Sequence, residues 1–308
     1  MSLSIIIPYY NREKFLEDTL ASVSKQTYRP IELILVDNGS TDSSAEICRR
    51  FSDKNSSKDF TIKLVEEPQK GASKARNTGA KYATNQYLYF FDSDDIMSTN
   101  FTADIIQKIK NSLIKYELIA VKTNIVLPNG KQYKRKSYNK TSVVDQIILS
   151  SLSTQSCVFR KDFFERIGKW NENLPCWNDW ELGIRIMLNK PTTLWIKHPT
   201  YHKIISHPES ITGNNFSERY QQIVKAIEQA KTHIADDLKA QKALTALQII
   251  FLGNIYREGS INLSKEIYQQ VSDSNHKIPL QRWFTFYCKH VGKGAWWIYI
   301  NLISKLIF

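Results

Sequence analysis

Tyr87-Leu-Tyr-Phe-Phe91 is followed directly by Asp92-Ser-Asp-Asp95. The first segment is apolar, aromatic and of strand length, which predicts a buried β-strand. The acidic segment would then lie at the carboxyl end of that strand, the edge of an open α/β sheet at which ligands bind. Carboxylates in a D-x-D pattern can turn toward one point, and their oxygens suit Mg²⁺ or Mn²⁺ that bridges to phosphates. The alternative is an acidic turn that caps the next helix.

The chain before this segment alternates between strand-like and helix-like patterns. Strands are predicted at 3–7, 31–36 and 61–65, and helices at 15–23, from a cap at Ser40 or Thr41 through Phe51, and at 71–83. This alternation predicts a mostly parallel open sheet with helices on both faces. Polar residues follow the first two strands as well, in Pro8-Tyr-Tyr-Asn11 and Asp37-Asn-Gly-Ser40. Together with 92–95 they predict a binding crevice at one edge of the sheet.

The size and composition are those of a folded protein with an anionic partner. The chain has 308 residues and a formal net charge of +12. This charge favours a phosphorylated substrate, an anionic membrane surface or a nucleic acid, but no nucleic-acid-binding motif is present. Four separated cysteines predict reduced thiols in a cytoplasmic protein. The amino terminus predicts a strand rather than a signal peptide, and no apolar run is long enough for a confident transmembrane helix.

Four motifs carry a family resemblance: Ser4-Ile-Ile-Ile-Pro-Tyr-Tyr-Asn11, Leu35-Val-Asp-Asn-Gly-Ser-Thr-Asp42, Gly71-Ala-Ser-Lys-Ala-Arg-Asn-Thr-Gly79 and Phe91-Asp-Ser-Asp-Asp95. They resemble the successive signatures of family 2 glycosyltransferases, densely over 3–97 and more thinly to about 212. The resemblance implies a GT-A fold and transfer of a sugar, with inversion, from a nucleoside diphosphate donor that we expect to be UDP-linked. It also implies a Mn²⁺ or Mg²⁺ cofactor and a glycan or lipid-linked acceptor in bacterial surface polysaccharide synthesis.

The resemblance also implies roles in nucleotide binding. Tyr10 would stack on the base and Asp37 would accept from the base N–H, whereas Asn38 departs from the second acidic residue of many relatives. Asp92 and Ser93 would face the ribose, and Asp94 would bind the metal. The remaining predicted nucleotide-binding residues are Pro8, Asn11, Lys74 and Arg76, of which Lys74 has an equal claim to be a solvated helix residue.

The catalytic base is expected in Trp177-Asn-Asp-Trp-Glu181. An inverting transferase needs a carboxylate that deprotonates the acceptor hydroxyl, and the resemblance assigns this role to Asp179. A position at a helix amino terminus would keep Asp179 ionised. Glu181 is the rival base. Trp177 and Trp180 would form either a sugar platform or part of the core.

Three further features are open at this stage. His207 is a candidate metal ligand or diphosphate contact, whereas His202 is interpreted as structural. The basic hairpin at 125–136 is either a solvated surface or a contact for an anionic acceptor. The tail at 281–308 is an amphipathic segment that suits peripheral contact with the inner face of the cell membrane, or else packs on the protein.

We expect a donor-binding half at 1–125, an acceptor-binding half at 126–215 and a helical region at 216–308. Two other functions compete with the transferase. A sugar nucleotidyltransferase of the same fold would need a Gly-rich phosphate loop after the first strand, which is missing. A non-catalytic nucleotide-sugar or glycan binding module would not need the carboxylates at 94 and 179.

Overall fold

The computed structural model describes residues 2–127, 129–134, 142–205 and 216–273. Contacts divide the chain into two compact units, one formed by 1–140 with 151–210 and the other by 141–150 with 211–308. Residues 141–150 thus belong with the carboxyl-terminal unit, which no pattern in the sequence indicated. The predicted division of the first unit into donor-binding and acceptor-binding halves stays a prediction.

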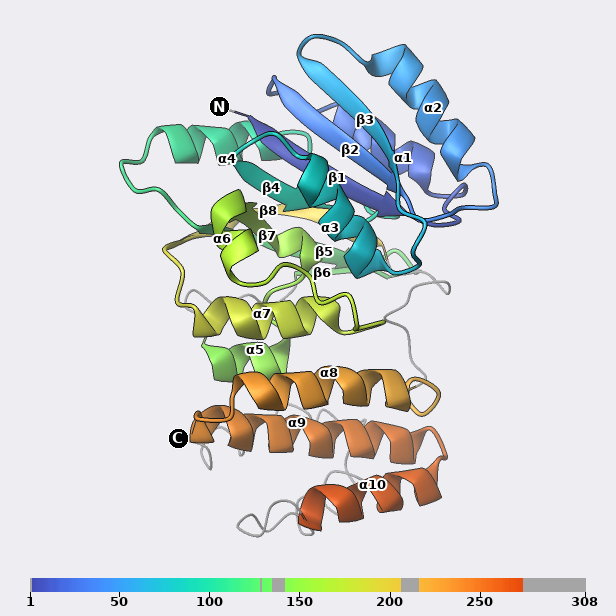
Figure 1. Ribbon diagram of the computed structural model, residues 1–308, viewed down its shortest axis with the longest axis vertical. Coiled ribbons are helices and arrows are strands. Elements are labelled where there is room, and N and C mark those ends of the chain that lie inside the picture. Colours follow the sequence, from blue (N-terminus) through green and yellow to red (C-terminus); the bar gives the residue numbers. More distant parts are fainter. Residues whose placement is uncertain (1, 128, 135–141, 206–215, 274–308) are drawn as a thin grey trace. The chain divides into compact units, whose positions relative to one another are not determined.

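Strands and helices alternate in the amino-terminal part of the first unit, as the sequence predicts (Figure 1). The amino-terminal part contains β1 Leu3–Tyr9, α1 Leu16–Ser24, β2 Ile31–Asp37, α2 Ser44–Asn55, β3 Phe60–Glu66, α3 Ala72–Tyr82 and β4 Tyr87–Phe90. It is followed by α4 Phe101–Lys110, β5 Leu118–Val126, β6 Gln132–Lys134, the short 3₁₀ helix η1 Thr154–Ser156, β7 Cys157–Arg160, α6 Lys161–Arg166, α7 Asn178–Leu188 and β8 Thr193–Ile205.

Within the described residues the strands form one mixed sheet in the order β3-β2-β1-β4-β7-β5-β6, with β8 paired to β5. The pairs β1–β2, β1–β4, β2–β3 and β5–β8 are parallel. β7 is antiparallel to both β4 and β5, so it is inserted between two strands that run in the same direction. The predicted hairpin is confirmed, because β6 is antiparallel to the end of β5.

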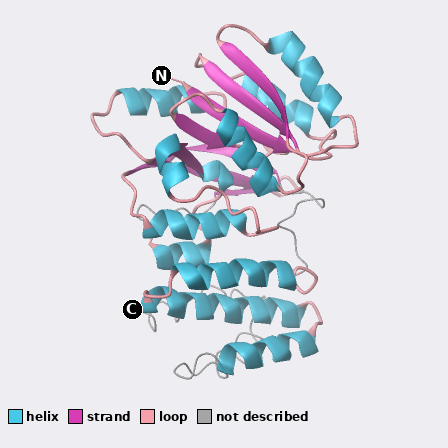
Figure 2. Ribbon diagram, in the orientation of Figure 1, coloured by secondary structure: helices cyan, strands magenta, loops and turns pink. Residues whose placement is uncertain are grey.

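Helices cover both faces of the sheet, as expected (Figure 2). Because successive strand residues point to opposite faces, odd-numbered and even-numbered residues of β1 and β2 contact different helices. The odd-numbered residues, such as Ile5 and Leu33, share a buried cluster with apolar residues of α1, α2 and α4. On the other face, a Cβ added to Gly79 of α3 would lie 2.4 Å from Ile6 Cγ2 and 3.1 Å from Val36 Cγ2. Helix α3 therefore lies very close to the two central strands.

The start of α2 differs from the prediction. The helix begins at Ser44 rather than near Ser40 or Thr41. Both earlier residues instead bond to the loop after β1: Asn11 N donates to Ser40 Oγ at 3.2 Å, and Thr41 N donates to Asn11 Oδ1 at 2.8 Å. Ser40 and Thr41, which local propensity assigns to the cap of α2, thus join the loop after β2 to the loop after β1 instead.

The second unit is helical, as predicted. It contains α5 Val143–Leu149, α8 Tyr220–His233, α9 Leu238–Arg257 and α10 Ile261–Asp273. α9 is capped by Asp237, which accepts from Ala240 N at 3.0 Å, and α10 is tied to it by a hydrogen bond from Ser264 Oγ to Leu252 O at 2.9 Å. α5 also packs on α9. The predicted amphipathic tail at 281–308 lies outside the described residues.

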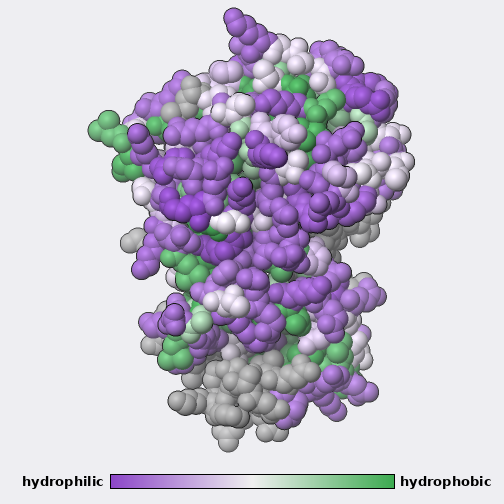
Figure 3. All heavy atoms as spheres, in the orientation of Figure 1, coloured by the Kyte–Doolittle hydropathy of each residue, from purple (hydrophilic) through white to green (hydrophobic). Residues whose placement is uncertain are grey.

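Hydrophilic side chains cover most of the visible face of the first unit (Figure 3). An exception is the loop between α4 and β5, where Leu113 and Ile114 are exposed. No helix in the described part of the chain is long and apolar enough to cross a membrane. Cys48, Cys157 and Cys176 are buried and form no disulfide bond, as predicted for these three.

Candidate active site

The polar ends of the first, second and fourth strands lie at one edge of the sheet, as the sequence predicts. Tyr9 pairs in register with Asp37 across β1 and β2. The residue after β4, Phe91, donates its N–H to Ile6 O at 2.9 Å and so continues alongside β1. The acidic segment 92–95 follows immediately. Because these strands are parallel, their carboxyl ends meet at the edge where α/β folds bind ligands.

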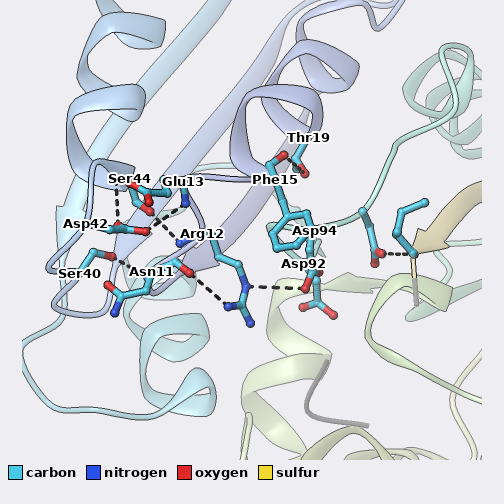
Figure 4. A network of polar contacts seen from close by, with 12 residues as sticks. Asn11, Arg12, Glu13, Phe15, Thr19, Ser40, Asp42, Ser44, Asp92 and Asp94 are labelled. Carbon is cyan, nitrogen blue, oxygen red and sulfur yellow. Dashed lines mark hydrogen bonds and ion pairs between the residues drawn. The ribbon is translucent and has the colours of Figure 1, made fainter. Parts of the chain in front are cut away.

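The loops after β1 and β2 are joined by side-chain to backbone hydrogen bonds (Figure 4). Arg12 N donates to Ser44 Oγ at 2.8 Å, and Glu13 N donates to Asp42 Oδ2 at 3.1 Å. In return, Ser43 N donates to Glu13 Oε2 at 3.1 Å. These bonds fix the backbone of Arg12, whose side chain extends toward the acidic segment.

Asp92 is held on both sides. Arg76 Nη2 donates to Asp92 Oδ1 at 2.7 Å from α3, and Gln155 Nε2 donates to Asp92 Oδ2 at 2.5 Å from η1. The neighbouring Ser93 is buried. Charge-assisted hydrogen bonds on both carboxylate oxygens fix the orientation of the Asp92 carboxylate.

Asp95 is a structural residue. It is 2% exposed, and its carboxylate accepts from Gln155 Nε2 at 2.6 Å and from Ile205 N at 2.8 Å. Burial, and then the negative charges of Asp92 and Asp94, raise the pKa of Asp95 well above its usual range, although these hydrogen bonds act in the opposite direction. Asp95 therefore joins the acidic segment to the end of β8.

Asp94 forms an ion pair with Arg12, with 3.6 Å between Asp94 Oδ2 and Arg12 Nε. Among the described residues, no group of three or more His, Cys, Asp or Glu side chains converges on a metal site. The residues present nevertheless fit a nucleotide-linked cation, because Mg²⁺ at such sites is held by one or two carboxylates together with substrate phosphates. The other predicted ligand, His207, lies outside the described residues.

The predicted base-binding residues Tyr10 and Asp37 lie at the ends of β1 and β2. Tyr10 is 45% exposed, and Lys70 Nζ lies 3.7 Å from the centroid of its ring. Lys70 Nζ also donates to Asn38 O at 3.1 Å and Gly39 O at 2.7 Å, which holds the ammonium group in place. Asp37 Oδ1 accepts from Ser40 N at 2.8 Å, so a base N–H would be accepted by Oδ2.

Asn38, where many relatives have a carboxylate, joins the end of β2 to the segment that precedes α3. Its Nδ2 donates to Glu67 O and Gln69 O, each at 2.8 Å, and its Oδ1 accepts from Gly71 N at 2.7 Å. The side chain is 5% exposed. Asparagine at this position therefore stabilises the loop before α3, because both the N–H donors and the oxygen acceptor of its amide bond to the loop backbone.

Arg76 is 6% exposed, and its guanidinium carbon lies 4.6 Å from the centroid of the Trp170 ring. Its Nε and Nη1 are buried and have no hydrogen-bond partner among the described residues. Buried charged donors without acceptors are costly, so these atoms would gain from an anionic ligand or water. Lys74 of α3, in contrast, donates to Gln69 Oε1 at 2.7 Å, in the loop that precedes the helix.

The start of α7 contacts the start of α3. Asn178 Nδ2 donates to the buried Ser73 Oγ at 3.1 Å. The next residue, Asp179, is half-buried in the first turn of α7 and accepts from Trp180 N at 2.8 Å. Trp177 and Trp180 contact each other with ring centroids 5.2 Å apart, and Trp180 is buried in the core. The helix carrying the predicted base is therefore joined directly to the helix carrying Arg76.

Glu181 is not placed to act as a base. Its side chain is fully buried and forms a two-pronged ion pair with Arg185, at 2.7 Å to Nε and 2.8 Å to Nη2. Arg185 Nη1 also donates to Ile167 O. Glu181 therefore anchors the segment before α7, and the interpretation of Glu181 as the rival base is disfavoured.

Three residues of the site were not identified from the sequence. Gln155 lies outside every recognised motif, Lys70 precedes the third motif, and Arg12 follows the first motif by one residue. Arg12 and Lys70 could have been identified, because each is a basic residue directly next to one of the four motifs. For Gln155 there was no such signal, because its position depends on the insertion of β7.

The chain matches the family described as "Glycosyl transferase family 2" over residues 4–168, more than half of its length. It therefore belongs to family 2 of the glycosyltransferases. The fold agrees: the S. aureus TarS 1–349 structure in complex with UDP-GlcNAc superimposes with a TM-score of 0.63 at 20% identity, covering 83% of this chain and 73% of that one. This confirms the fold class expected from the sequence.

Two curated relatives are similar in sequence. Glycosyltransferase GlyA of Streptococcus pneumoniae is 32% identical over 156 residues, 47% of this chain but 21% of GlyA. WfgD of Escherichia coli, a UDP-Glc:alpha-D-GlcNAc-diphosphoundecaprenol beta-1,3-glucosyltransferase, is 33% identical over 178 residues, 53% of this chain and 67% of WfgD. The similarity to GlyA thus spans only a small part of that relative.

Proposed function

We propose that this protein is an inverting glycosyltransferase that moves a sugar from a UDP-linked donor to a glycan or lipid-linked acceptor in bacterial polysaccharide synthesis. The observation that carries the proposal is the acidic segment at the end of β4. Asp92 is paired with Arg76 at 2.7 Å, and Asp94 is paired with Arg12 at 3.6 Å, beside the ends of parallel strands. Alternating cations and carboxylates at this edge suit a diphosphate together with its counter-ion.

The donor nucleotide would bind along the ends of β1, β2 and β4. Tyr10 offers an exposed aromatic face for the base, and Asp37 Oδ2 accepts the base N–H. Asp92 faces the ribose hydroxyls. Two relatives support UDP as the nucleotide, because TarS was solved with UDP-GlcNAc and WfgD is named as using UDP-Glc.

Asp94 would hold a divalent cation, Mn²⁺ or Mg²⁺, which when bound neutralises the negative charge of the departing diphosphate. Asp179 takes the proton of the acceptor hydroxyl as general base. The hydroxyl oxygen then forms a bond to the anomeric carbon while the bond from that carbon to the diphosphate oxygen breaks. One displacement on the opposite face inverts the anomeric configuration and releases the nucleoside diphosphate.

The proposed acceptor rests on the name of one relative and on the net charge of this chain. WfgD is named for an acceptor with a sugar on a lipid diphosphate. A net charge of +12 favours such an anionic acceptor, or the anionic surface in which it lies.

Calorimetric titration of UDP tests the proposal. The wild type is expected to bind UDP more tightly in Mn²⁺ than in EDTA, and to cleave a UDP-sugar slowly in Mn²⁺. Asp94→Ala should remove the metal-dependent part of the affinity and abolish turnover without changing the melting temperature, because a loop carboxylate contributes little to the core.

Asp53→Ala is the matched control, since it removes an exposed carboxylate from α2 in the same unit. It should leave UDP binding unchanged. Wild-type affinity that is equal in Mn²⁺ and EDTA would contradict the metal-dependent mechanism, and metal-dependent binding without any sugar transfer would favour a binding module.

A further inference from the structure

Gln155 joins two carboxylates of the acidic segment through one amide group. It lies in η1 and is 4% exposed. Its Nε2 is 2.5 Å from Asp92 Oδ2 and 2.6 Å from Asp95 Oδ2. An amide nitrogen carries two hydrogens, so it can donate one to each carboxylate. The two acidic residues, which repel each other, are thereby held at one point.

The backbone around Gln155 is itself fixed. Ser153 N donates to Ser156 Oγ at 2.7 Å, and Ser156 N donates to Ser153 O at 3.0 Å, so the single turn of η1 is closed on itself. On the inner side, Tyr89 Oη donates to Gln155 O at 2.9 Å. Gln155 therefore has little freedom to rotate away from the acidic segment.

This support continues into the core through His202. Ser98 N approaches His202 Nδ1 at 3.4 Å, which assigns Nδ1 as the acceptor and Nε2 as the protonated nitrogen. His202 Nε2 then donates to Tyr89 Oη at 2.8 Å, and the Tyr89 hydroxyl hydrogen remains for Gln155 O. Both Tyr89 and His202 are buried, and their rings stack. This confirms the structural interpretation of His202 and shows that the chain of hydrogen bonds has one consistent direction.

The consequence concerns Asp92. Its Oδ1 is held by Arg76 from α3 and its Oδ2 by Gln155 from η1. Arg76 alone would leave the carboxylate free to rotate about its bond to Cβ, whereas two partners on opposite oxygens fix its plane. We propose that Gln155 is a positioning residue for donor binding, which holds the Asp92 carboxylate in the orientation that receives the ribose hydroxyls. This inference rests on the proposed function, in which Asp92 faces the donor.

The test is a double-mutant cycle of UDP affinity, measured by calorimetry in Mn²⁺ with Gln155→Met, Asp92→Ala and the double variant. Methionine has nearly the size of glutamine but no donor. Gln155→Met alone is expected to weaken UDP binding roughly tenfold, the effect of about 1.4 kcal/mol. In the Asp92→Ala background the same change should cost less than about twofold, because a residue that acts through Asp92 has nothing left to orient.

Two further variants separate positioning from general stability. Gln155→Glu keeps the shape but places a third carboxylate against Asp92 and Asp95, so it should weaken UDP binding more than Gln155→Met does. Glu32→Gln changes another buried polar side chain of the same unit, which accepts from Lys63 Nζ at 2.6 Å and from Thr84 N at 2.9 Å near the amino-terminal end of β2. It should lower the melting temperature yet leave UDP affinity within about twofold.

Equal UDP affinity for the wild type and Gln155→Met would overturn the inference. So would a tenfold loss that persists in the Asp92→Ala background, since Gln155 would then act by another route. Absence of UDP binding by the wild type would instead overturn the proposed function, and the role of Gln155 with it.

Discussion

Arg12 and Asp94 form an ion pair between the loop after β1 and the segment after β4, with 3.6 Å between Nε and Oδ2 and side chains that are 19% and 18% exposed. The arginine is therefore the cation next to the carboxylate to which we assign the metal. Two cations that share one carboxylate compete for it, and the ion pair should lower the affinity of Asp94 for a divalent ion.

Arg12→Gln is accordingly expected to bind Mn²⁺ more tightly in the absence of nucleotide. A partly exposed pair contributes up to about 1 kcal/mol, which corresponds to roughly fivefold in affinity. Titration of free Mn²⁺ by electron paramagnetic resonance measures the change. Arg49→Gln is the control, because it removes the same charge from an arginine that is 61% exposed on α2. Equal shifts in the two variants would mean that net charge, and not the ion pair, controls the affinity.

Asp179→Asn is expected to retain UDP affinity while the rate of transfer falls roughly 10²-fold or more, the effect of removing a general base. Its melting temperature should stay close to that of the wild type, since Asp179 is half-buried and, among the described residues, its side chain accepts a hydrogen bond from the N–H of the next residue. Initial-rate kinetics and calorimetry on the same preparation separate these effects.

Glu181→Gln should show the opposite profile. The fully buried ion pair with Arg185 would lose one charge, and breaking a buried pair costs about 3–5 kcal/mol. The variant should therefore melt at a clearly lower temperature but, while folded, transfer sugar at a rate near that of the wild type. A folded Glu181→Gln protein with a 10²-fold lower rate would show that the base has been assigned to the wrong residue.

His202 should make the stability of the first unit sensitive to acid. Burial lowers the pKa of His202 to about 3, below the value of about 6.5 expected in the unfolded chain. The neutral imidazole therefore contributes stability above pH 6.5, and this contribution is lost as the pH falls from 6.5 toward 3. By pH 4.5 the loss is about 2–3 kcal/mol, at about 1.4 kcal/mol for each pH unit.

Urea denaturation of His202→Asn at several pH values checks this prediction. Asparagine is chosen because residue 202 has a φ of 62°, in the left-handed region that asparagine tolerates. The variant should be less stable at pH 7 because it leaves space in the core, but its stability should fall less steeply than that of the wild type between pH 6.5 and 4.5. Parallel slopes would contradict the assignment of a neutral buried imidazole.

Gly79→Ala is expected to destabilise the first unit, although alanine favours a helix. Its Cβ would lie 2.4 Å from Cγ2 of the buried, β-branched Ile6, which has little room to move. Overpacking of this kind costs about 1–3 kcal/mol and exceeds the gain in helix propensity of about 1 kcal/mol. Thermal denaturation measures the effect, and Lys81→Ala on the exposed side of α3 should be nearly neutral.

The sequence predicted the parallel part of the sheet and its polar edge because both follow from local patterns. Buried strands such as Tyr87–Phe90 are continuous apolar runs, and parallel pairing brings the residues that follow them to one edge. The placement of Asp37 and Asp92 at the same edge of the sheet needed no long-range information beyond the topology.

The supporting residues could not be predicted in this way. Gln155 reaches Asp92 because β7 enters antiparallel between β4 and β5, and no spacing in the sequence encodes that pairing. Likewise, Glu181 and Asp179 both lie in the first turn of α7. Only burial separates their roles: Glu181 is fully buried, whereas Asp179 is half-buried. The partner of Glu181, Arg185, lies one turn further along, so an i, i+4 ion pair was the available signal that this carboxylate is structural.

The amide of Asn38 makes the conformation of the loop between β3 and α3 depend on the residue at position 38. An aspartate at this position could still accept from Gly71 N, but it could not donate to the carbonyl oxygens of Glu67 and Gln69 and would repel them. The segment that carries Lys70, and with it the cation over Tyr10, would have to rearrange. An aspartate at position 38 is therefore expected to be tolerated only together with substitutions between residues 67 and 71 that change the path of this loop.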